Sequence, residues 1–100
     1  MYVKLSRNAY VRNWGTWTYM FDRLTSSDRI FKDAELFTRW ISRHPISIEE
    51  LIDKIHGEYC DVSRETLVHD VLEFVEQLRH DGIILVGENL EEIKKIYEEE

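Results

Sequence analysis

Residues that often organise small domains are scarce in this sequence of 100 residues, which has one cysteine, one proline and four isolated glycines. The single cysteine, Cys60, cannot form an intrachain disulfide, and this favours a reducing compartment. Isolated glycines provide no glycine-rich phosphate loop. No stretch approaches the roughly 20 apolar residues of a membrane span, and no apolar signal core follows the first residues. We therefore expect a soluble, cytoplasmic protein without a nucleotide-binding loop.

The charge of the chain is unevenly distributed. An apolar fraction of 43% is sufficient for one small core, and the formal net charge is −7. Residues 1–32 carry six basic and two acidic side chains (+4), residues 33–87 five and twelve (−7), and residues 88–100 two and six (−4). Phosphate contacts need clustered Lys and Arg, which the acidic body lacks. The distribution favours a protein or peptide partner over nucleic acid.

The first third of the chain predicts a small antiparallel sheet. Two aromatic and β-branched stretches, Tyr10–Trp14 and Trp17–Asp22, flank the turn residues Gly15 and Thr16, which indicates a hairpin. After a polar stretch, Arg29–Lys32 is predicted to form a third strand at the edge of this sheet. Unpaired backbone groups at such an edge can accept an added strand, and the flanking charges discourage random pairing. Residues 1–5 remain unplaced.

From Asp33 the apolar period changes to that of a helix. The first helix is predicted to begin near Asp33, with Leu36, Phe37, Trp40 and Ile41 on one face, and to stop before Pro45, since a residue preceding proline disfavours helical geometry. Ser47 and Glu50 then form a capping box that starts a second helix. This second helix is predicted to end between Gly57 and Tyr59.

The stretch from Ser63 to Gly82 predicts the longest helix. Ser63 can cap its start, and Gly82 can end it by adopting a left-handed conformation. At about 100° per residue its apolar arc spans roughly 160°, which is wider than one contact requires. Such a helix packs against two elements, or it leaves an apolar edge over a groove. The arc consists of Leu67, Val68, Val71, Leu72, Phe74, Val75 and Leu78.

A short apolar strand, residues 83–86, follows this helix. The expected fold class is α+β, a winged helix-turn-helix with an N-terminal three-stranded antiparallel sheet packed on three helices. Residues 1–87 are expected to form the domain, and residues 88–100 an acidic C-terminal helix or linker.

Candidate chemical groups do not combine into a catalytic site. His56 and Cys60 are four residues apart, but no second Cys/His pair completes a zinc site. The acidic residues of the long helix lie opposite its apolar face, where solvated carboxylates are the usual finding. The three tryptophans are expected in core and sheet packing. The sequence therefore predicts no catalytic residue, no metal and no cofactor, and the protein is not expected to be an enzyme.

The segment SIEELIDKIHGEYCDVSRETLVHDVLEFVEQLRHDGIILV, residues 47–86, with KLSRNAYVRN, WTYMFDRL and DAELFTRWI before it, resembles the PqqD-like domains known as RiPP recognition elements. These domains bind precursor peptides in the biosynthesis of ribosomally made natural products. The resemblance covers residues 4–86. It departs from the family pattern after the first helix, where residues 42–45 replace a glycine-containing step.

The resemblance implies a domain that binds the leader region of a precursor peptide as an added strand and presents it to a modifying enzyme, often a radical SAM maturase. The enzyme is either separate from the domain or fused to it. The leader would pair with the third strand and lie in a groove beside the third helix. The implied peptide-binding residues are Arg29, Ile30, Phe31, Lys32, Val68, Leu72, Val75 and Arg79.

Two other functions stay open at this point. A DNA-binding winged-helix regulator would use residues 64–80 as its recognition helix, although four acidic residues there oppose contact with phosphates. A structural subunit of an oxidoreductase complex would use the same groove for assembly. Nothing in the composition separates these functions from leader binding as sharply as the resemblance does.

Overall fold

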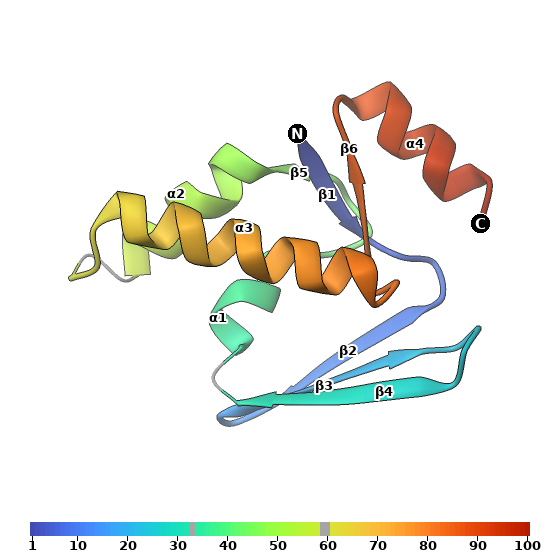
Figure 1. The fold of residues 1–100 in the computed structure, drawn as a ribbon, viewed down its shortest axis with the longest axis horizontal. Coiled ribbons are helices and arrows are strands. Elements are labelled where there is room, and N and C mark those ends of the chain that lie inside the picture. The colour runs from blue at the N-terminus through green and yellow to red at the C-terminus, as the bar shows by residue number, and fades with distance from the viewer. Residues whose placement is uncertain (33, 59–60) are drawn as a thin grey trace.

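Two three-stranded antiparallel sheets and four helices make up the chain in the computed structural model, which describes residues 1–32, 34–58 and 61–100 (Figure 1). The strands are β1 Tyr2–Leu5, β2 Ala9–Trp14, β3 Trp17–Asp22, β4 Ser27–Lys32, β5 Ile46–Ser47 and β6 Ile84–Gly87; the helices are α1 Glu35–Thr38, α2 Ile48–Glu58, α3 Arg64–His80 and α4 Leu90–Glu98. The fold class is therefore α+β, as predicted. Predictions that concern Asp33, Tyr59 and Cys60 lie outside the described residues.

The first sheet has the order β5-β1-β6, so the unplaced N-terminal residues form its central strand. Val3 of β1 pairs with Ile46 on one side and with Val86 on the other. The acidic C-terminal segment folds as α4, which is capped by Asn89 and packs over β1 and β6 with Ile93 fully buried. Sequence periodicity could not show these pairings, because they join residues more than 40 positions apart.

The second sheet has the order β2-β3-β4. The predicted hairpin is present, with Trp14 opposite Trp17 and with Gly15 at φ +55°, a backbone conformation that glycine adopts without steric cost. The predicted third strand is also present, and it begins two residues earlier, at Ser27. As predicted, β4 lies at an edge of its sheet.

Helices α2 and α3 begin where their caps predict. The Ser47 hydroxyl accepts a hydrogen bond from the Glu50 N–H at 3.1 Å, and the Ser63 hydroxyl accepts one from the Thr66 N–H at 3.3 Å. The first helix, by contrast, is much shorter than predicted and ends at Thr38. Its Thr38 hydroxyl lies 3.3 Å from the backbone carbonyls of Ala34 and Glu35 and shares its single proton between them, and Ala34 provides no side-chain cap. Local hydrogen bonding of this kind competes with propagation of the helix.

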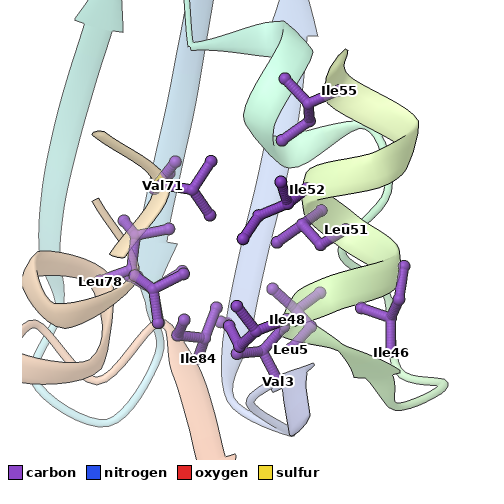
Figure 2. Close-up of a cluster of buried hydrophobic side chains, with 14 of the residues drawn as sticks. Val3, Leu5, Ile46, Ile48, Leu51, Ile52, Ile55, Val71, Leu78 and Ile84 are labelled. Carbon is purple, nitrogen blue, oxygen red and sulfur yellow. The ribbon is translucent and has the colours of Figure 1, made fainter. Parts of the chain in front are cut away.

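The main core lies where α2 and α3 meet the first sheet (Figure 2). In Figure 1, α3 crosses the centre of the molecule, with α2 and the first sheet on one side and α1 and the second sheet on the other. The wide apolar arc of α3 thus serves two sets of contacts. The labelled core side chains in Figure 2 are Val3, Leu5, Ile46, Ile48, Leu51, Ile52, Ile55, Val71, Leu78 and Ile84. No helix of the described chain is long and apolar enough to cross a membrane.

Candidate functional site: the open edge of β4 beside α3

Hydrogen-bonded residue pairs alternate along the strands of the second sheet, and this alternation shows which backbone groups of β4 point away from β3. The Arg23 N–H donates to the Asn8 carbonyl at 2.8 Å, and bonded pairs alternate along antiparallel strands. With the observed registers, Phe31 and Arg29 therefore bond to β3. The N–H and C=O groups of Asp28, Ile30 and Lys32 point to the open edge of the sheet, where an extended peptide chain can pair with them.

The side chains of β4 alternate in the opposite sense. Arg29 and Phe31 share the inner face of the sheet with the buried residues Met20 and Thr18, whereas Ile30 and Lys32 point to the outer face. Every second residue of β4 thus offers its backbone to the edge, and the residues between them turn their side chains toward α3.

Two contacts connect β4 to α3. The Phe31 and Phe74 rings meet edge to face, with centroids 5.7 Å apart, and Phe74 also contacts the Phe37 ring of α1 at 5.2 Å. Two residues earlier on β4, the Arg29 Nε lies 2.9 Å from the Asp81 Oδ2 just after the end of α3. The Asp81 side chain is only 11% exposed, so this ion pair is partly shielded from solvent.

Two cavities lie along the side of α3 that carries Phe74 and Asp81. A cavity of about 360 Å³ lies beside the ion pair and is lined by residues including Met20, Ser27 and His80. A second cavity, of about 320 Å³, lies beyond Phe74 and is also lined by Phe37, Asp70, Glu73 and Gln77. The first cavity combines the charged side chains of Arg29 and Asp81 with apolar ones, and the second combines aromatic rings with the carboxylates of Asp70 and Glu73. Inner side chains of a strand added to β4 would lie beside these cavities.

The four site residues predicted on α3 are not brought to β4. At 100° per residue, Leu72 lies about 160° around the helix from Phe74, and it lines a different hollow beside Met1 and Tyr2. Val68 and Val75 pack into the core, and Arg79 is exposed and bound to Glu76. The structure instead places Asp70, Phe74, Gln77 and Asp81 on the β4 side of α3. The binding roles of the β4 residues stay predictions.

The apolar arc predicts Phe74 in the core and the acidic residues of α3 in solvent. One available signal was the spacing of Asp70, Phe74, Gln77 and Asp81, which at steps of three and four residues forms a continuous stripe on a helix. The stripe alone does not show which neighbour it meets, because that depends on how β4 is positioned by the rest of the fold.

Near the site, two surface carboxylates have pKa values that are lowered by a neighbouring arginine. The Arg79 guanidinium donates to the Glu76 carboxylate, and this hydrogen bond lowers the pKa of Glu76 below its usual value. Arg39 likewise lowers the pKa of Glu35, chiefly by donating hydrogen bonds to it at 2.8 and 2.9 Å, and it also binds Glu58. Among residues 1–32, 34–58 and 61–100, no group of three or more His, Cys, Asp or Glu side chains is placed to hold a metal ion.

An open strand edge next to a helix is a geometry to which an extended peptide can add as a further strand. The sequence profile of the family described as "Coenzyme PQQ synthesis protein D (PqqD)" matches residues 34–84, which is 51 of the 100 residues. The chain therefore belongs to the PqqD family, as its resemblance indicated.

A solved structure described as "TbiB1 in Complex with the TbiA(beta) Leader Peptide" superposes on this chain with a TM-score of 0.68 and 18% sequence identity. The superposition covers 86% of this chain and 99% of that chain. At this identity the likeness shows a shared fold that includes nearly all of the related protein. A search of curated proteins finds no match.

Proposed function

We propose that this protein binds the leader region of a ribosomally synthesised precursor peptide as a strand added to β4. The observation that carries the proposal is the open edge of β4, whose Asp28, Ile30 and Lys32 backbone groups face outward beside α3. Membership of the PqqD family and the shared fold with a protein solved together with a leader peptide both support it. The domain acts in the cytoplasm as a non-catalytic carrier for a modifying enzyme, such as a radical SAM maturase.

The proposed binding groove contains the four β4 residues predicted from the sequence, Arg29, Ile30, Phe31 and Lys32. On α3, however, it contains other residues than the predicted ones. The leader's inner side chains meet Phe74 and lie beside the two cavities. The carboxylates of Asp70 and Glu73 at the second cavity favour a basic or apolar leader residue there. We further propose that α2, α3 and β6 form the winged helix-turn-helix half, that residues 1–87 contain the recognition module, and that residues 88–100 are accessory to it.

The proposal is tested by titrating the isotope-labelled protein with the leader of a precursor peptide encoded beside it. We expect the largest amide shifts at Asp28, Ile30 and Lys32, with smaller shifts around Phe74. Replacing Ile30 with proline removes one open N–H without removing a bond to β3, so Ile30→Pro should weaken leader binding by about tenfold or more. The matched control is Ile30→Ala, which keeps the N–H and should bind within about twofold of the wild type.

Equal leader affinity of Ile30→Pro and Ile30→Ala would contradict strand addition at β4. Shifts confined to the exposed side of α3, with salt-sensitive binding to duplex DNA, would favour a regulator instead. The exposed surface of α3 includes Glu65, Asp70, Glu73 and Glu76, which oppose contact with DNA phosphates.

A further inference from the structure

The outer face of the second sheet carries an uncovered aromatic surface. In Figure 1, α1 and α3 lie on one side of this sheet, and no described element lies on the other. Four large apolar side chains there are at least half exposed: Tyr10 (56%), Trp14 (59%), Trp17 (50%) and Ile30 (66%). We call this surface, together with Arg12 and Tyr19, the aromatic face. Contiguous exposed apolar surface of this kind usually marks an interaction site.

The aromatic face is shaped into two hollows. The Trp14 and Tyr19 rings stack with centroids 6.4 Å apart and form a ridge that borders both hollows. On one side, Trp17 and Ile30 complete an entirely apolar hollow of about 290 Å³. On the other side, a hollow of about 370 Å³ includes Tyr10 and Arg12. The face thus offers one apolar pocket and one pocket with a cation.

Charge indicates the kind of partner that this face accepts. The outer face of the sheet carries the cations Arg12 and Lys32 and one carboxylate, Asp28, to which the Tyr19 hydroxyl donates a hydrogen bond at 3.4 Å. The 68 residues after Lys32 carry −11. Two copies joined face to face would bring Arg12 and Lys32 of one copy toward the same cations of the other, which opposes a symmetric dimer. An acidic partner surface is complementary.

Nucleic acid fits the face less well than protein does. Stacking of bases requires open ring faces. Here Trp14 and Tyr19 stack on each other, and the Arg12 and Arg23 guanidinium groups lie 5.8 and 5.6 Å from the Trp14 and Tyr10 ring centroids. Trp, Tyr and Arg are also the residue types that dominate binding energy at protein interfaces.

We propose that the aromatic face docks the peptide-modifying enzyme, through an enzyme surface that places an apolar side chain in the Trp17–Ile30 hollow and an acidic side chain beside Arg12. This inference rests on the proposed function, in which the leader extends the sheet along the β4 edge, with every second side chain toward the groove and the others toward the outer face. The outward side chain of Ile30 belongs to the strand whose edge pairs with the leader. The enzyme and its peptide substrate would thus meet at β4, with the enzyme on the outer face of the sheet and the leader along its edge.

The experiment measures binding of the modifying enzyme encoded beside this chain to the wild type, Trp17→Glu, Arg12→Glu and Leu24→Ser. Leu24 is 76% exposed in the turn between β3 and β4 and lies outside both hollows, so it is the matched control. We expect Trp17→Glu and Arg12→Glu each to weaken enzyme binding by about tenfold or more, and Leu24→Ser by less than about twofold. All three variants should bind the leader within about twofold of the wild type.

Any other result contradicts either enzyme docking at the aromatic face or leader binding at β4. Leader binding by the wild type with no enzyme binding, or with equal enzyme binding by all variants, overturns docking at the aromatic face and leaves the proposed function intact. Absence of leader binding overturns the proposed function itself. A dimer in sedimentation velocity that Trp17→Glu dissociates, or binding of a single-stranded RNA oligonucleotide that Trp17→Glu abolishes, would assign the face to a different partner and overturn enzyme docking.

Discussion

The two sheets of this protein differ in how their faces are used. The first sheet, β5-β1-β6, is covered by α2 and α3 and by α4, and Val3 and Ile84 are almost fully buried. The second sheet, β2-β3-β4, buries only its inner face, and it leaves both its outer face and the edge of β4 open. Stability is therefore concentrated in the first sheet, and the surfaces available for binding are concentrated in the second.

The largest expected effect on stability comes from replacing one isoleucine of each sheet with alanine. Ile84→Ala in β6 removes a side chain that is 1% exposed, and it should lower the free energy of unfolding by about 2–5 kcal/mol. Ile30→Ala in β4 removes one that is 66% exposed and should cost less than about 1 kcal/mol. Urea denaturation monitored by circular dichroism measures both values. Similar losses for the two variants would contradict the division between the sheets.

A smaller effect is expected from adding a methyl group at one glycine of each sheet. A Cβ at Gly87 in β6 would lie 2.8 Å from the backbone N of Ile93, so Gly87→Ala should displace α4 and cost about 1–3 kcal/mol. A Cβ at Gly15 in the β2–β3 turn meets no atom within 4 Å, so Gly15→Ala should cost only about 1 kcal/mol, from its φ of +55°.

Thermal unfolding of the two glycine variants ranks the costs. Gly57→Ala, within α2 and also without a close neighbour, is the control and should stabilise the protein by about 0.5–1 kcal/mol. A larger loss for Gly15→Ala than for Gly87→Ala would show that the second sheet is the more tightly constrained one.

The smallest effect concerns the surface ion pairs, which belong to neither sheet. Because Arg39 stabilises the ionised Glu35 carboxylate, the stabilisation is present at neutral pH and is lost as the pH falls through the lowered pKa of Glu35. Arg39→Gln should raise the pKa of Glu35 toward 4.5, and an NMR titration of the Glu35 side-chain carboxyl measures this change. The pKa of Glu76, lowered by Arg79, is the internal control and should not move.

The sequence predicted those helices and turns that are determined by interactions between residues close together in the chain. The Ser47 and Ser63 caps, the Gly15 turn and the apolar period of α3 each act within a few residues, and each predicted element is found. The length of α1 was overestimated, because the apolar spacing through Ile41 does not include the hydrogen bonds of Thr38, one of which reaches Asn13 of β2.

The candidate site was predicted only in part, for a related reason. The edge position of β4 follows from the order of the strands along the chain, so it could be predicted. The side of α3 that meets β4 depends on α1 and on the first sheet, which hold α3 from two directions. An apolar arc does not distinguish these directions, and Leu72 was therefore predicted where the structure places Phe74.

The side chains of β4 alternate between two surfaces, so different residues contact the groove and the outer face. Arg29 and Phe31 direct their side chains to the groove, whereas Ile30 and Lys32 give their backbone to the edge and their side chains to the outer face. Because any residue except proline supplies the same backbone groups, substitutions at Ile30 and Lys32 can change the outer surface without altering the groove. This strand can therefore evolve, or be engineered, toward a new partner on one face while it keeps its specificity on the other.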